Sequence, residues 1–251
     1  MNKLPQITLA FWVMKICATT LGETAGDLLS MTLNVGYAIS SMILISVFLL
    51  TLVTQLFSRT YNPLLYWVVI LATSTAGTTM SDFMDRTLGL GYASGSLILI
   101  GILLVIFAAW RLSGDSLNVN QIRSLRGELF YWLAILFSNT LGTALGDYLA
   151  DDSGLGFAGG ALLIGSTIAA VVLLKYFTRL SSVLLFWVAF VLTRPFGATL
   201  GDFLTKSHQQ GGLDFGTVGS SAVLAGILLV LIVGASWVQN RYSRQSAAEL
   251  S

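Results

Sequence analysis

Four aspartates occupy equivalent positions in the chain, each fifteen residues after a tryptophan. The four segments align without a gap, as Trp12 to Asp27, Trp67 to Asp82, Trp132 to Asp147, and Trp187 to Asp202. Carboxylates are hard oxygen ligands that suit Mg²⁺, Ca²⁺, Mn²⁺ and monovalent ions, and they also carry protons. The repeated aspartates therefore predict a shared site for a small cation or a proton.

The composition places this site in a membrane. Only 10% of the 251 residues are charged and 55% are hydrophobic, whereas a soluble domain carries about 25% charged residues. The net charge of +1 provides no basic surface for nucleic acid, and one cysteine with one histidine cannot form a zinc-type ligand set. We therefore expect an all-α integral membrane protein.

Stretches of about 20 apolar residues, the length that crosses a bilayer, predict eight transmembrane helices. The expected spans are 9–29, 37–57, 64–84, 92–110, 129–150, 157–177, 183–204 and 215–238. One compact membrane domain is expected, with a first half at 1–111, a linker at 112–128, a second half at 129–240 and a tail at 241–251.

The aspartate segments are parts of a fourfold internal repeat. The first and second copies are 55 residues apart, as are the third and fourth, and the two pairs are offset by 120 residues. Each copy contributes two spans, so every copy enters the membrane in the same direction. The sequence thus predicts four parallel helical hairpins around a pseudo-fourfold axis along the membrane normal, with the four aspartates at one depth.

Lysine and arginine set the expected orientation. Nine lie on one side of the spans, at positions 3, 59, 111, 123, 126, 175, 179, 241 and 244, and only Arg86 and Lys206 lie in the opposite loops. This positive-inside pattern places both termini in the cytoplasm, with the linker and the tail. The four tryptophans that begin the odd spans are expected to form an aromatic belt at that interface.

Helical spacing predicts which side chains accompany the aspartates. The residues four before them are Glu23, Thr78, Thr143 and Ala198, and those seven before are Thr20, Thr75, Thr140 and Pro195. The polar members are expected to line the ion-binding site. Small residues on an adjacent face predict close helix packing, and its glycines are Gly22, Gly26, Gly77, Gly142, Gly146, Gly197 and Gly201.

Two basic residues, Lys15 and Arg194, are expected deep in the membrane. One interpretation is that each is an internal counter-charge, neutralising a carboxylate in a buried pair. The other is that they compete with a cation for Glu23 or an aspartate, as in ion–proton antiport. The sequence leaves both open.

The repeated Thr-x-Gly-x-x-x-Gly-Asp blocks, Thr20 to Asp27 and Thr140 to Asp147, resemble those of a family of bacterial multi-pass inner-membrane proteins described as uncharacterised membrane-anchored proteins. The second copy departs at Ser81 and the fourth at Pro195. The similarity covers nearly the whole chain, and it implies a bacterial inner-membrane location without assigning an activity.

These features favour a transporter or exporter of a small hard cation, either a divalent metal such as Mn²⁺ or Mg²⁺ or a monovalent ion, with coupling to protons. Two alternatives stay open: a cation channel with an Asp ring, and a membrane assembly or stress protein whose aspartates only cap helices. An enzyme is not expected, because no Asp completes the Gly-x-Gly-Asp motif of intramembrane aspartyl proteases.

The expected partners are membrane lipid and the small cation, without nucleic acid. No cofactor is expected apart from a bound divalent cation. Four repeats are enough to close a bundle as a monomer, and a homo-oligomer stays open.

Overall fold

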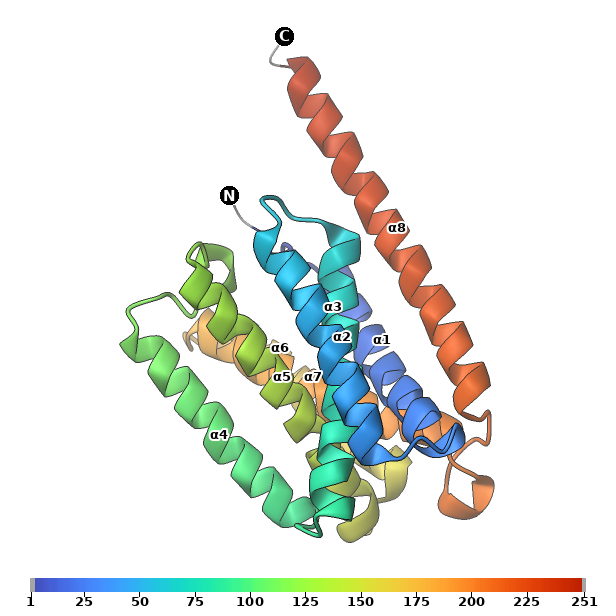
Figure 1. Ribbon diagram of the computed structural model, residues 1–251. Helices are drawn as coiled ribbons and strands as arrows, with labels where there is room; N and C mark the ends of the chain where they lie inside the picture. Colours follow the sequence, from blue (N-terminus) through green and yellow to red (C-terminus); the bar gives the residue numbers. More distant parts are fainter. Residues whose placement is uncertain (1–2, 250–251) are drawn as a thin grey trace.

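The computed structural model describes residues 3–249, with side chains described as far as Trp237. Over this range the protein is helical and contains no strand. Eight long helices follow one another: α1 Leu9–Asp27, α2 Tyr37–Phe57, α3 Pro63–Asp82, α4 Tyr92–Leu112, α5 Leu125–Asp147, α6 Gly156–Phe177, α7 Ser182–Thr205 and α8 Thr217–Glu249 (Figure 1).

The helix bounds differ from the expected spans by at most four residues, except at the end of α8. That helix continues through most of the segment expected to be a tail, and it extends beyond the rest of the bundle (Figure 1). The side chains of Arg241 and Arg244 lie outside the described residues. The N-terminal segment and the end of α8 lie at the same end of the bundle (Figure 1).

A polar side chain caps the start of each odd-numbered helix. Thr8, Asn62, Ser124 and Ser181 each accept a hydrogen bond from the backbone N–H three residues later. Such caps satisfy an N–H group that has no partner within the helix. They fix where the odd-numbered helices begin, and hence the level at which each aspartate ends its helix.

The chain turns sharply after three of the aspartates. The helices α1, α3 and α5 continue into five-residue π-helical segments, η1 Leu28–Thr32, η2 Phe83–Thr87 and η4 Tyr148–Asp152. Gly36 and Gly91 then precede α2 and α4 with φ of 81° and 73°, a conformation that glycine adopts without steric cost. After α7 the turn differs and contains the 3₁₀ segment η5 His208–Gln210.

The four odd-numbered helices form a closed inner ring. Helix α1 packs against α3, α3 against α5, α5 against α7, and α7 against α1. The even-numbered helices lie outside, and each packs mainly against the inner helix of the following repeat: α2 on α3, α4 on α5, α6 on α7 and α8 on α1. The expectation of helical hairpins is corrected here, because the turn after each aspartate carries the chain across to the neighbouring repeat.

Burial separates the two rings. In the most apolar stretch of α3, 72% of the residues are buried, against 17% in α2. Seven described helices are long and apolar enough to cross a membrane, and only α1, which carries Lys15, Glu23 and Asp27, falls outside this set. The outer helices expose many large apolar side chains, as expected for surfaces that face lipid rather than water. The chain is thus a multi-pass membrane protein.

The connection between the halves, including η3 Val119–Gln121, packs onto the bundle. Val119 and Ile122 are buried, and Trp187 donates a hydrogen bond to the carbonyl of Leu117 at 3.0 Å. Lys3 forms an ion pair with Glu128 at 2.9 Å. The linker therefore covers the end of the bundle at which the inner helices begin.

Candidate functional site

Close packing through glycine brings the inner helices together. Gly22 contacts Ser74 of α3, Gly142 contacts Arg194 of α7, and Gly197 contacts Thr19 of α1. A Cβ atom on Gly77 would lie only 2.9 Å from the backbone carbon of Asn139 in α5. The remaining predicted packing glycines repeat this pattern one turn later, since Gly26, Gly146 and Gly201 contact Thr78, Ala198 and Glu23 respectively.

The four repeated aspartates are all buried at the ends of the inner helices, and two basic side chains bridge them in pairs. The Nζ atom of Lys206 lies 2.7 Å from Asp27 and 3.1 Å from Asp202. Arg86 lies 3.0 Å from Asp82 through Nε and 3.2 Å from Asp147 through Nη2. Each bridge thus joins the aspartates of two adjacent inner helices.

Lys206 follows the last residue of α7, and its two aspartate partners stabilise its protonated form. Burial lowers the pKa of Lys206, but the Asp202 and Asp27 carboxylates raise it by more, so that it lies well above the usual value. Sequence reasoning placed Lys206 and Arg86 in outer loops and missed these bridges. The signal was their spacing, because each follows an aspartate of its own repeat by four residues.

One turn further into the bundle, all four inner helices meet at a buried ion pair. The Nη2 atom of Arg194 lies 2.8 Å from Glu23 and 2.6 Å from the hydroxyls of both Thr78 and Thr143. The two threonines also donate to Glu23, at 3.3 and 3.2 Å. Glu23 is 3% exposed and Arg194 is fully buried, so this pair lies in the protein interior. For Arg194 the structure shows the counter-charge arrangement.

Lys15 lies deeper, and its surroundings differ from those of Arg194. Its amine is fully buried, donates to Asn139 at 3.4 Å and lies 4.2 Å from the centre of the Phe190 ring. Among the described residues no carboxylate forms an ion pair with Lys15, so the structure shows no counter-charge arrangement for this residue. Glu23, eight residues further along the same helix, is paired with Arg194 instead. Asn139, which sequence reasoning missed, in turn donates to Thr73 at 2.9 Å.

Three predicted polar residues bind their own helices instead. Thr20, Thr75 and Thr140 each donate to a carbonyl four residues earlier, at 2.9, 3.1 and 3.0 Å. The structure gives them no bond to a charged member of the cluster among the described side chains. A hydroxyl within a helix can satisfy itself in this way, so helical phase alone did not identify the residues that meet.

Below Lys15, aromatic side chains fill the interior. The hydroxyls of Tyr66 and Tyr131 lie 2.6 Å apart, and Phe11 packs against Trp67 and Phe190. Trp67 and Trp132 are fully buried in the protein, which corrects the expectation that they form part of an aromatic belt at the membrane interface. The reason is that each packs against Tyr66 inside the bundle. These aromatic side chains therefore separate the charged residues of the inner helices from the end of the bundle at which the inner helices begin.

Three carboxylates come closest to forming a cation site. Ligand oxygens of Glu23, Asp147 and Asp202 all lie within 4.8 Å of one another, and all three residues are buried. Such a set of hard oxygen ligands suits Mg²⁺, Mn²⁺ or a monovalent ion better than a soft metal. Asp27 and Asp82, which the sequence also nominated, lie outside this group.

Comparison with known proteins identifies the repeat. The family described as Repeat of Unknown Function (DUF347) matches the chain four times, at residues 10–61, 65–116, 130–181 and 185–242. Each match takes in one inner helix and the outer helix that follows it. No curated protein and no solved structure matches the chain. Because the four matches cover well over half of its length, the chain belongs to the DUF347 repeat family.

Proposed function

We propose that this protein transports a small hard cation across a membrane, with coupling to protons. The observation that carries the proposal is the group of buried carboxylates Glu23, Asp147 and Asp202, whose oxygens lie within 4.8 Å of one another. Buried ionisable groups in a membrane protein are costly and commonly mark an ion or proton pathway. The substrate class follows from the oxygen ligands.

The charge balance supports a site that exchanges cations and protons. Five carboxylates on the inner helices, Glu23 and the four repeated aspartates, accompany four basic groups: Lys15, Arg86, Arg194 and Lys206. The buried Asp85 lies on η2, where it accepts a hydrogen bond from Ser81, and it is left out of this balance. With the five carboxylates and the four basic groups all ionised, one negative charge is in excess, which a proton or a monovalent cation would balance. A divalent cation would leave one positive charge in excess, and release of the Lys15 proton would remove it.

Arg194 offers a route for coupling. Its guanidinium occupies the side of Glu23 that also faces Thr78 and Thr143. A cation that binds Glu23 must therefore displace Arg194 or share the carboxylate with it. Competition between Arg194 and the cation would link binding to a rearrangement of α7 against α1.

The filled interior supports a transporter over a channel with an Asp ring. Arg194 contacts side chains of the other three inner helices at one level of the bundle. At a second level, buried tyrosine and tryptophan side chains fill the space between the inner helices. An ion-conducting pore would need an open path past both. A protein with a purely structural role would have no evident need for Lys15, whose buried amine lacks an acidic partner among the described residues.

We also propose eight spans in a pseudo-fourfold arrangement. The polar residues of α1 are buried among the other inner helices, so its low hydropathy reflects an interior position rather than contact with water. The excess of Lys and Arg on one side supports cytoplasmic termini. The residues that resemble the bacterial membrane-anchored proteins support a bacterial inner-membrane location.

Reconstitution into proteoliposomes tests the proposal. Uptake of Mg²⁺, Mn²⁺, Na⁺ and K⁺ is measured with and without a pH gradient, and Glu23→Gln, Asp147→Asn and Asp202→Asn are each expected to lower the rate at least tenfold while the protein still inserts. Asp152→Asn is the matched control, since Asp152 is exposed at the same end of α5. Wild-type rates in all three variants, or no cation movement by the unaltered protein, would overturn the proposal.

A further inference from the structure

A pocket opens beside the inner ring, away from the carboxylates. Its volume is about 590 Å³, and it lies among α1, α6, α7 and the linker between the halves. Two residues that line it, Leu9 and Tyr176, are 80% and 76% exposed, so this side of the pocket faces the surroundings of the bundle. The pocket is therefore accessible from the side of the helical bundle, near the end at which the inner helices begin.

The internal repeat explains why the pocket exists. In the second repeat, Phe107 and Trp110 of α4 pack against Trp187 of α7, with ring centres 4.9 and 5.6 Å apart. The third repeat is shifted by 65 residues, so the equivalent positions in α6 are Val172 and Lys175. Two large aromatic side chains are thus replaced by a small one and a flexible one, and the space beside α1 is left unfilled.

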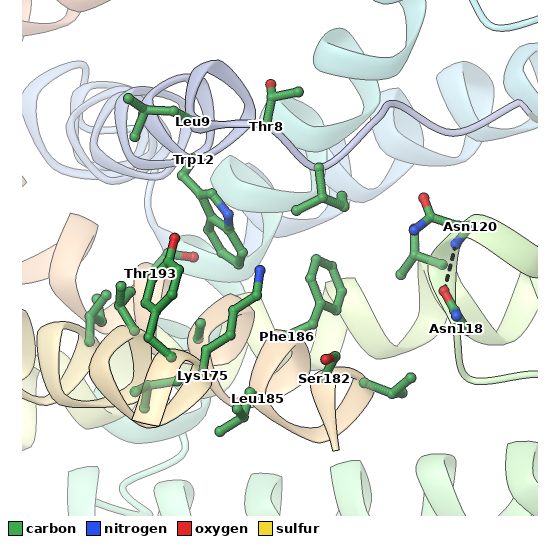
Figure 2. Close-up of a pocket in the computed structure, with 18 of the residues that line it drawn as sticks. Thr8, Leu9, Trp12, Asn118, Asn120, Lys175, Ser182, Leu185, Phe186 and Thr193 are labelled. Atoms are coloured by element: carbon green, nitrogen blue, oxygen red, sulfur yellow. Dashed lines mark hydrogen bonds between the residues drawn. The ribbon is translucent and has the colours of Figure 1, made fainter. Parts of the chain in front are cut away.

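The lining combines an apolar wall with one charge. Trp12, Ile168, Phe186 and other apolar side chains form most of the wall, and Lys175 is the only charged residue among those described around it. Figure 2 shows the Lys175 amine pointing into the space between Trp12 and Phe186. None of the described carboxylates forms an ion pair with this amine. A ligand that fits must therefore be largely apolar and carry a negative charge near Lys175.

We propose that this pocket binds an anionic phospholipid, with an acyl chain along the apolar wall and the phosphate at Lys175. The lipid would come from the leaflet at the end of the bundle that carries most Lys and Arg residues. Side access, an apolar wall and a single cation near the interface together match such a lipid. The site is separate from the proposed cation site, and it holds whether or not the protein transports ions.

Native mass spectrometry of the full-length protein tests this directly. The protein is mixed with equal amounts of phosphatidylglycerol and phosphatidylcholine that have the same acyl chains, and the retained lipids are counted. One phosphatidylglycerol per chain is expected to remain bound. Lys175→Gln is expected to reduce the preference for phosphatidylglycerol about fivefold, the effect of one lysine near a membrane surface.

Two further variants separate the pocket from general surface charge. Val172→Phe combined with Lys175→Trp copies the packing of α4 and is expected to remove the retained lipid whatever its headgroup. Arg179→Gln removes a nearby exposed charge that does not line the pocket, and it should leave the preference unchanged. Equal losses in Lys175→Gln and Arg179→Gln, or equal retention of the two lipids by the unaltered protein, would overturn the proposal.

Discussion

At the scale of single residues, Arg194 and Glu23 form the pair on which the interior depends. One guanidinium nitrogen of Arg194 contacts side chains from three other helices, whereas its Nε and Nη1 atoms lack a hydrogen-bond partner among the described residues. Removing one partner of a buried ion pair leaves an uncompensated charge, but replacing both is often tolerated. This contrast separates the contribution of the pair to stability from its contribution to transport.

We expect Glu23→Gln to lower the free energy of unfolding by about 3–5 kcal/mol, because it leaves the Arg194 charge unpaired. The double variant Glu23→Gln/Arg194→Met should recover most of this loss and still fail to transport. Thermal unfolding in detergent and uptake by proteoliposomes measure the two effects. The single variant Arg194→Met is measured alongside them. If the losses of Glu23→Gln and Arg194→Met simply add in the double variant, the two side chains are not coupled.

Lys206 provides a second prediction at this scale. Because its folded pKa lies above the ordinary value of 10.5, its bridge contributes fully below about pH 10.5 and is lost only as the pH rises through the folded pKa. The bridge should therefore persist across the physiological range. Lys206→Gln would leave Asp27 and Asp202 without this counter-charge, and protonation of these carboxylates would relieve their repulsion.

Lys206→Gln should accordingly lower the unfolding temperature at pH 8 and have a smaller effect at pH 5. The measurement is the unfolding temperature of both proteins from pH 5 to pH 9. Arg179→Gln, which removes an exposed charge elsewhere, should show no such trend. A deficit that is the same at every pH would contradict the assigned bridge.

At the scale of helices, small residues determine how closely the inner ring packs. The spacing of the glycines predicted close contact, and the structure shows each inner helix meeting the next through such residues. Sequence reasoning could not determine which helix each glycine meets. In three of the four repeats, a π-helical turn with no simple sequence pattern leads from the inner helix to an outer helix that packs on the following repeat. The fourth outer helix, α8, packs on α1 after a different turn, which contains η5.

Gly77→Ala tests this packing. The added Cβ would lie 2.9 Å from the backbone of Asn139 and Thr140, which cannot rotate away as a side chain could. We expect a loss of about 1–3 kcal/mol in the free energy of unfolding, the usual cost of overpacking. Gly101→Ala in α4 is the control, because nothing lies within 4 Å of its added Cβ, and alanine should there be neutral or stabilising by up to about 1 kcal/mol. Equal effects at both positions would show that Gly77 is not a packing contact.

At the scale of the whole molecule, the sequence predicted the helical elements and the equivalence of the aspartates more fully than the contacts among them. The helix ranges follow from apolar length and the Asp positions from the repeat, both local properties. The bridges by Arg86 and Lys206 and the isolation of Lys15 depend on which helices are adjacent. Which helices are adjacent depends in turn on the packing of each outer helix against the next repeat, and this packing is seen only in the three-dimensional structure.

The packing of the last outer helix, α8, on the first inner helix, α1, is the feature of the whole molecule that is most open to experiment. Ser221 of α8 donates to Thr24 of α1 at 2.9 Å, so cysteines at these two positions should form a disulfide under mild oxidation. The pair is introduced together with Cys17→Ala, which removes the native thiol, and with a protease site in the loop at 207–212. After cleavage, α8 should stay attached to the rest of the same chain until a reductant is added.

The matched control keeps Thr24→Cys but places the second cysteine at Ser236, fifteen residues further along α8 and therefore about 22 Å away along the helix axis. That pair should not cross-link. If the Thr24 and Ser221 pair links no better than this control, α8 does not pack on α1. If it links two copies into a covalent dimer instead, α8 packs on α1 of a neighbouring chain, and the packing within one chain is wrong.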